Sequence, residues 1–123
     1  MTITQHPAET VAVTGEPLEL LRTMLEEQFV LHTNRLTELT VYGRLPGHGG
    51  YEPRTLDALA ATARRGIGET AQALRRMSEG TYGVCTRCAK PIPLGYLRTV
   101  PHAQRCTRCH DGILAAETSG FGR

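Results

Sequence analysis

Four cysteines in two pairs carry the clearest chemistry of this sequence. They read Cys85-Thr86-Arg87-Cys88 and Cys106-Thr107-Arg108-Cys109, and the 123 residues contain no other cysteine. Two residues between paired thiols let one tight turn aim both sulfurs at one ion, and the CxxC…CxxC spacing is typical of a structural zinc site. Four thiolates complete the tetrahedral shell of Zn²⁺ and leave no position for a substrate water. The pattern therefore predicts one structural zinc ion.

Other uses of these cysteines stay open on the sequence. Two disulfides would suit a secreted domain, but the first 13 residues show neither the basic region nor the apolar core of a secretory signal. Residues 106–110 also read CxxCH, the c-type haem attachment pattern. Haem would leave Cys85 and Cys88 without a role. His110 could replace a cysteine as ligand, or it could simply lie on a helix that follows Cys109.

Basic residues gather around the cysteines. Residues 1–79 contain eight Arg and ten Asp or Glu, whereas residues 80–123 contain six Lys or Arg and two Asp or Glu. Four thiolates and one Zn²⁺ leave a charge of −2, which nearby cations offset. The alternative is a nucleic-acid patch, but no aromatic side chains interleave with the arginines for base stacking. We expect charge compensation, without direct DNA binding, for Arg87, Arg98, Arg105 and Arg108.

Composition narrows the class of protein. Aromatic residues make up only 5% of the sequence and Trp is absent, so we expect a small core that a bound metal ion would help to stabilise. No apolar run has membrane-spanning length, and we expect a cytoplasmic protein. No carboxylate pair, nucleophile set or phosphate-binding glycine spacing is recognisable, so we do not expect an enzyme.

Two long amphipathic helices are expected before the cysteines. The first should begin near Glu16-Pro17 and stop near Tyr42-Gly43, because residues 43–50 contain four glycines and a proline. Its apolar residues recur at three- and four-residue steps on one face, which His32 shares. The stripe consists of Leu18, Leu21, Leu25, Phe29, Leu36 and Leu39.

The second helix should open at Pro53 and end near Gly80. Its stripe is close to a heptad pattern, with small residues that permit close approach of a partner helix. Gly66 and Gly68 each weaken the helix by about 1 kcal/mol relative to Ala, and they indicate a bend or a tight contact. The stripe consists of Leu56, Ala60, Ala63, Ile67, Leu74 and Met77.

These elements predict a mainly α fold: an antiparallel, coiled-coil-like two-helix hairpin, a small C4 zinc-finger module and a short C-terminal helix. We expect a flexible tail over 1–15, the hairpin over 16–79 with its tip at 42–52, and the zinc module over 80–123. The short helix would span 111–118. The module follows the second helix directly, so it can staple the base of the hairpin.

The cysteines lie in a longer motif. The stretch from Gly80 to Cys88, GTYGVCTRC, together with Ile92, Leu97 and residues 100–103, resembles the DksA/TraR-type C4 zinc-finger family. The resemblance covers about a third of the chain at motif level, and the preceding hairpin agrees with the architecture of DksA-like members. It implies a non-enzymatic regulator whose partner is bacterial RNA polymerase. In that family the hairpin enters the secondary channel and its tip acts near the active site.

The sequence departs from the family pattern at the tip. DksA-like tips carry paired aspartates, whereas residues 42–52 contain no aspartate and only one acid, Glu52. The hypothetical partner-binding residues of this tip are Tyr42, Arg44, His48 and Glu52. Some members cooperate with ppGpp, and the altered tip leaves that response open. Within the module, Ala89 stands where the family often has Gly, and Gly95-Tyr96 replaces a frequent acidic–Arg pair.

Three hypotheses for function therefore remain. The leading one is a DksA/TraR-like transcription regulator that binds RNA polymerase through its hairpin. The second is a zinc-dependent nucleic-acid-binding module. The third is an interaction adaptor whose hairpin pairs with another chain, because a two-helix hairpin buries only part of each helix face. For the free protein we expect a monomer or weak self-association.

Overall fold

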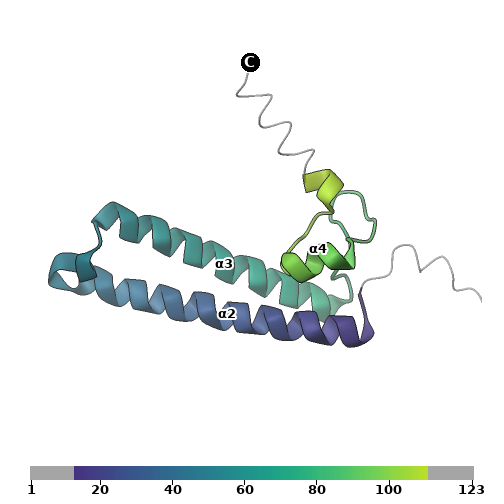
Figure 1. Cartoon of the computed structure of the whole chain (residues 1–123), viewed down its shortest axis with the longest axis horizontal. Coiled ribbons are helices and arrows are strands. Elements are labelled where there is room, and N and C mark those ends of the chain that lie inside the picture. The colour runs from purple at the N-terminus through teal and green to yellow at the C-terminus, as the bar shows by residue number, and fades with distance from the viewer. Residues whose placement is uncertain (1–12, 111–123) are drawn as a thin grey trace, which may run out of the picture.

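The computed structural model describes residues 13–110. Within them, α2 (Gly15–Arg44) and α3 (Pro53–Glu79) run antiparallel and side by side, and α4 (Leu94–Thr99) lies near the end where α2 begins and α3 ends (Figure 1). The predicted mainly α hairpin followed by a small module is confirmed. Most of the expected tail over 1–15 and all of the expected helix over 111–118 lie outside the described residues.

The boundaries of the hairpin follow local chemistry. α2 continues through Gly43 and ends at Arg44, slightly beyond the predicted stop. It ends there because Leu45 precedes Pro46 and adopts an extended conformation with φ −86° and ψ 147°, which the proline ring favours. α3 begins at Pro53, as predicted. It ends at Glu79, because the following Gly80 has a positive φ of 78° and its N–H bonds back to the carbonyls of Arg76 and Met77.

The two predicted apolar stripes face each other. Leu21, Leu25 and Leu39 are buried on α2, and Leu56, Ala63 and Met77 are buried on α3. The other predicted stripe residues are half-buried. Thr70 and Ala73 also belong to the buried face of α3, with exposed fractions of only 1%. The buried Thr70 hydroxyl has a hydrogen-bond partner, because it donates to the Gly66 carbonyl at 2.8 Å.

The two glycines of α3 have different surroundings. A Cβ on Gly66 would lie 2.6 Å from the His32 ring, so this glycine is required by a close approach between the helices. A Cβ on Gly68 would meet no atom within 4 Å. His32, on the stripe of α2, is thus a half-buried packing residue whose ring takes the space that any larger residue at 66 would need.

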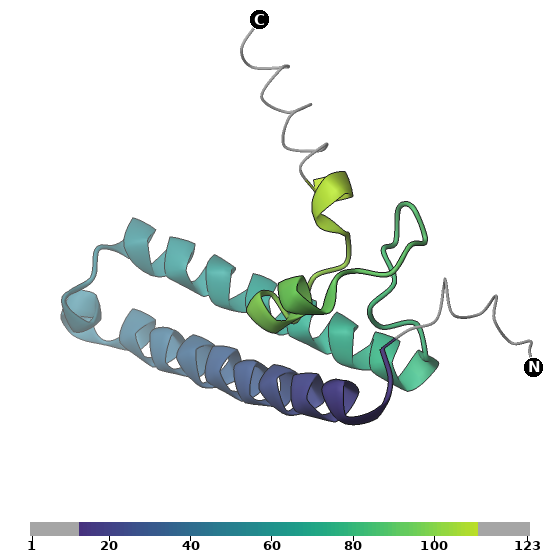
Figure 2. The same cartoon turned by 45° about the vertical axis from the view of Figure 1, so that its right-hand side comes forward.

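The tip is a single tight turn, η1 (Pro46–Gly50). Gly47, His48 and Gly49 have φ values of 80°, 53° and 63°, so the chain reverses through left-handed backbone. A Cβ on Gly49 would approach the Tyr42 ring to 2.7 Å, which shows how closely the turn folds over that ring. The Tyr42 ring also packs against Tyr51, with centroids 5.6 Å apart. This turn joins the far ends of α2 and α3 (Figure 2).

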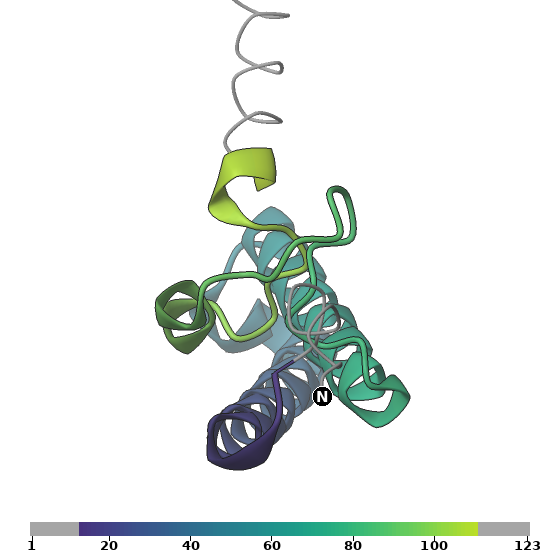
Figure 3. The same cartoon turned by 90° about the vertical axis from the view of Figure 1, so that its right-hand side faces the viewer.

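The main core lies at the opposite end, where the module covers the hairpin base. Leu21 and Leu25 from α2 and Ala73 and Met77 from α3 form one buried cluster with residues of the module. The end-on view shows the module gathered at this end of the two helices (Figure 3). The module contributes Tyr82, Cys85, Ile92, Leu97, Ala103 and Cys106.

Candidate metal centre

The first cysteine pair sits on a tight knuckle just after α3. The backbone N–H of Cys85 donates to the Lys90 carbonyl at 2.8 Å, and the Ile92 N–H donates to the Gly83 carbonyl at 2.8 Å. Between them, the Ala89 N–H closes the turn on the Cys85 carbonyl at 2.9 Å. Ala89 has a φ of 64°, a left-handed conformation that costs an L residue about 1 kcal/mol or more.

The second cysteine pair opens a helical turn. Residues 107–110 are helical, and the His110 N–H donates to the Cys106 carbonyl at 2.9 Å. The Thr86 N–H donates to the Gln104 carbonyl at 2.8 Å. This bond holds the first knuckle against the segment that leads into Cys106, so backbone geometry brings the two pairs together.

The four sulfurs form one cluster. The Sγ atoms of Cys85, Cys88, Cys106 and Cys109 all lie within 4.8 Å of one another, and those of Cys88 and Cys106 are 3.7 Å apart. Four sulfurs about 2.3 Å from a tetrahedral zinc ion would be separated by roughly 3.8 Å. The donor set therefore fits a single zinc ion with a closed shell.

Two thiols of this cluster, Cys85 and Cys109, have pKa values displaced in opposite directions. Burial alone would raise the pKa of Cys85, but backbone N–H groups of Cys88, Cys106 and Arg87 donate to its sulfur and bring the pKa down to about 6. Burial, with hydrogen bonds to the neighbouring sulfurs, raises the pKa of Cys109 to about 12. The thiolate of Cys85 is favoured and that of Cys109 is opposed, a conflict that a dication removes.

Arg76 joins α3 to the first knuckle. Its guanidinium Nη2 donates to the Val84 carbonyl at 2.7 Å, and the residue is only 8% exposed. Burial lowers its pKa, while the neighbouring Tyr82 and Cys85 act in the opposite direction. The sequence analysis missed Arg76. Its position directly beside the stripe residue Met77 was the available signal, since a charged residue at the edge of a buried face needs a partner.

Tyr82 holds the other side of the module. Its side chain is fully buried, and its hydroxyl donates to the Pro101 carbonyl at 2.7 Å. Burial raises the pKa of Tyr82 to about 12, so the neutral donor is favoured. The Tyr82 carbonyl accepts from the Val13 N–H at 3.1 Å. One residue thus links the start of α2, the first knuckle and the loop before Cys106.

Three of the four arginines predicted near the cysteines line two hollows. Arg87 and Arg108 line one hollow with Lys90 and three of the cysteines. Arg105 lines a second one, while Arg98 lies on α4 and lines neither. The four predicted residues are all exposed. Only Arg87 and Arg108 lie beside the sulfurs, where their charge can offset the thiolates.

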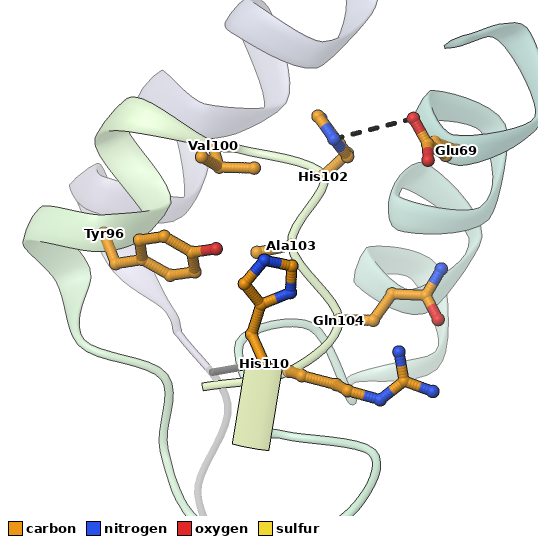
Figure 4. Close-up of a pocket in the computed structure, with 8 residues that line it drawn as sticks. Glu69, Tyr96, Val100, His102, Ala103, Gln104 and His110 are labelled. Atoms are coloured by element: carbon orange, nitrogen blue, oxygen red, sulfur yellow. Dashed lines mark ion pairs between the residues drawn. The ribbon is translucent and has the colours of Figure 1, made fainter. Parts of the chain in front are cut away.

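The second hollow, of about 240 Å³, lies between α4, the loop that follows it and His110, with Glu69 of α3 at its edge (Figure 4). Beside it, the loop contacts α3: His102 Nε2 lies 3.6 Å from the Glu69 carboxylate, and Gln104 donates to Gln72 at 2.8 Å. These side-chain contacts connect the module to α3. Sequence reasoning did not find them, because their partners lie about 32 residues apart in the chain.

The predicted tip residues fall into two groups. Arg44 and Glu52 are exposed, whereas Tyr42 and His48 are half-buried. Tyr42 packs within the turn, and His48 lines a shallow hollow between the two helix ends with Leu56 and Asp57. Leu45, which the sequence analysis did not single out, is 44% exposed beside them.

Residues 80–113 match the family model described as the prokaryotic dksA/traR C4-type zinc finger. This segment is therefore similar to the zinc finger of that family. The predicted resemblance is therefore confirmed for the module, and so is the predicted cofactor, since a C4 finger of this family takes zinc and its four cysteines lie together.

The fold of the larger part of the chain has a solved counterpart. The structure of transcription factor DksA2 from Pseudomonas aeruginosa superposes with a TM-score of 0.69 and 21% identity, over 82% of this chain and 85% of that one. The likeness establishes that hairpin and module together adopt the DksA2 fold.

A curated relative is an uncharacterized protein of Aquifex aeolicus (strain VF5). It is 31% identical over 67 residues, which is 54% of this chain. The match covers 46% of the relative, so this chain spans about half the length of the protein it matches.

None of the helices in the described part of the chain combines the length and apolarity needed to cross a membrane.

Proposed function

We propose that this chain is a transcription regulator that binds bacterial RNA polymerase and performs no catalysis itself. The observation that carries the proposal is the joint likeness of hairpin and module to a solved transcription factor, at a TM-score of 0.69. The zinc-finger match over residues 80–113 supports it independently from sequence. The partner follows from the family resemblance.

The zinc centre serves as an anchor in this proposal. Cys85, Cys88, Cys106 and Cys109 hold one zinc ion, whose closed shell leaves no site for substrate. The ion fixes the two knuckles, and their buried neighbours complete the core at the hairpin base. Zinc thus acts on partner binding indirectly, by keeping the hairpin at a defined angle to the module.

The working end is the tip. Two helices of 30 and 27 residues hold it about 40 Å from the base of the hairpin. It presents Arg44, Leu45 and Glu52 on its surface and contains no aspartate. A tip of this chemistry acts by contacting one polymerase state better than another, because only differential binding shifts an equilibrium. Its effect need not have the sign produced by an acidic tip.

Retention on core RNA polymerase tests the docking step. Zinc-loaded protein should be retained by immobilised polymerase at micromolar concentration, and retention should fall after chelation. A bacterial polymerase from the source organism is the proper bait, with bovine serum albumin as the control surface. Loss of retention in the zinc-loaded protein would exclude the proposal.

A tip variant separates docking from action. We expect Arg44→Ala with Leu45→Ser to retain binding to polymerase while changing the lifetime of open promoter complexes in single-round transcription. The matched control is Arg75→Ala with Ala71→Ser, two exposed positions of α3 far from the tip. If both pairs change the lifetime equally, the tip is not the working end.

The nucleic-acid alternative makes a distinct prediction. Arg87, Lys90 and Arg108 beside the cysteines could contact phosphates. Binding through them would weaken steeply with salt, because each phosphate contact releases counterions. We expect no such salt-dependent binding to duplex DNA, since these cations offset the charge of the zinc centre. A steep salt dependence in a gel-shift titration would favour this alternative.

A further inference from the structure

The outward face of α2 carries large apolar side chains that the hairpin does not use. Among the described residues, the strongly exposed large hydrophobics all lie on α2 or directly after it, and none lies on α3 or in the module. Leu31 is 65% exposed, Val30 54% and Leu20 52%. Val30 and Leu31 form an exposed apolar pair in the middle of α2, and exposed apolar patches mark interaction surfaces. The set is Leu20, Val30, Leu31, Val41 and Leu45.

Four of these residues recur along α2, and Leu45 follows its end. Three turns of α-helix take about 10.8 residues. Val30 and Leu31 follow Leu20 by ten and eleven residues, and Val41 follows Leu31 by ten. At about 100° per residue, Val30 and Val41 lie on the side of α2 opposite buried Leu21, whereas Leu20 and Leu31 lie about a quarter turn from it. In the middle of α2, Val30 and Leu31 lie beside Thr23, Glu26 and Glu27 on an open stretch of surface.

The spacing is symmetrical about the peptide bond between Val30 and Leu31. Leu20 precedes Val30 by ten residues, and Val41 follows Leu31 by ten. Two antiparallel copies of α2 centred on this point would place Leu20 of one against Val41 of the other, and Val30 against Leu31. An interface that uses the same patch on both copies needs this self-complementarity.

The charges of α2 favour the antiparallel direction. Glu16 and Glu19 lie in its first turns and Arg44 lies in its last. Antiparallel pairing brings both acids of one copy beside Arg44 of the other, and it places Glu27 opposite Asn34. Parallel pairing would set each acid against its own counterpart, which destabilises a helix pair. These charges therefore favour a second copy of α2 in the antiparallel orientation.

We infer that a second copy of this chain covers the outward face of α2, with the helices antiparallel and a two-fold axis between Val30 and Leu31. The contact involves a single helix face from each copy, so it lies at the small end of stable interfaces, about 1,200 Å² in total. We therefore expect reversible association. It extends along α2 as far as Arg44 and Leu45 at the edge of the tip, and it lies apart from the metal centre.

The mass of the full zinc-loaded chain tests the association. By sedimentation at about 100 µM, a concentration that saturates a micromolar dimer, we expect twice the chain mass of 13.5 kDa, falling to one chain on dilution. Leu31→Glu should stay monomeric throughout. The control Ala61→Glu introduces the same residue at an exposed site of α3 and should behave as the parent. A monomeric parent at that concentration overturns the inference, as does equal disruption by both variants.

Cross-linking tests the orientation. A mixture of Leu20→Cys and Val41→Cys chains, mildly oxidised with zinc present, should form a covalent heterodimer. Either variant alone should not, because residue 20 lies about 31 Å along the helix from residue 41. Covalent homodimers of Leu20→Cys at the same yield would contradict the antiparallel arrangement. Circular dichroism of each variant confirms that the helices are intact.

Discussion

Backbone conformation and packing contacts determine which positions of this chain tolerate substitution. Gly66 is required because the His32 ring occupies the place of a Cβ, whereas Gly68 faces open space. Ala89 and His48 adopt left-handed backbone although they are not glycine. The same substitution can therefore stabilise this protein at one glycine and destabilise it at another. Local contacts, rather than helix propensity, determine the sign of the change in stability.

The two glycines of α3 give a matched prediction. Gly68→Ala should raise the free energy of unfolding by about 1 kcal/mol, because it improves helix propensity without a clash. Gly66→Ala should lower it by about 1 to 3 kcal/mol through overpacking against His32. Urea unfolding of both variants measures the difference. Adding His32→Ala should reduce the penalty of Gly66→Ala, and an unchanged penalty would show that the ring is not the obstacle.

Ala89→Gly should stabilise the knuckle. Glycine adopts the φ of 64° freely, whereas alanine pays a steric cost, so we expect a gain of about 1 kcal/mol. The gain should appear as slower zinc release to a chromogenic chelator as well as a higher unfolding midpoint. Lys90→Gly, at the neighbouring position, serves as the control. An equal effect of both changes would assign the gain to something other than the backbone conformation.

At the scale of elements, the hairpin and the module are joined by polar contacts from one side of α3. Glu69, Gln72 and Arg76 follow one another at three- and four-residue spacing, and they contact His102, Gln104 and the Val84 carbonyl. Beneath them, Tyr82 and Leu97 continue the core formed by Leu21 and Met77. The orientation of the module is therefore set by α3.

Arg76 is the strongest of these connections. Arg76→Met keeps much of the side-chain volume but removes the charged donor to Val84, and we expect a loss of about 1.5 to 3 kcal/mol. Arg75→Met, one residue earlier and exposed, should change stability little. Chemical denaturation followed by far-UV circular dichroism compares the two. Equal stabilities for both variants would mean that the Arg76 contact contributes nothing net.

For the whole molecule, the zinc centre and the hairpin base form a single cooperative unit. Cys85 and Cys106 are members of the same buried cluster as Leu21 and Leu25 of α2. The tip lies at the far end of both helices, where packing involves Tyr42, Gly49 and Tyr51 (Figure 1). Loss of the metal should therefore destabilise the base of the hairpin first and its tip later.

Zinc removal should loosen the base before the tip. After chelation we expect faster hydrogen exchange of amides in residues 80–106 and at the start of α2, because protonated or mutually repelling thiols replace a closed metal shell. Cys109→Ser should reproduce the change with zinc present. Exchange that accelerates equally at residues 42–52 would indicate global unfolding. Unchanged exchange at the base would show that the ion does not support it.

The sequence by itself determined the helices, their buried faces, the two-helix hairpin and the cysteine cluster. These features depend on local periodicity, glycine and proline positions, and the spacing of two CxxC pairs, all of which lie within short stretches of chain. The sequence could not decide between a bend and a tight contact at Gly66. That outcome depends on which residue of α2 lies opposite, and only tertiary structure sets that register.

The tertiary structure also decided how the module is held. The partners Arg76 and Val84, Tyr82 and Pro101, and Glu69 and His102 meet only after the chain has folded back. It further showed that the arginines near the cysteines lie in separate places and that the apolar face of α2 points outward. Burial and long-range contact are properties of the folded chain, because the same local pattern can face a core or a partner.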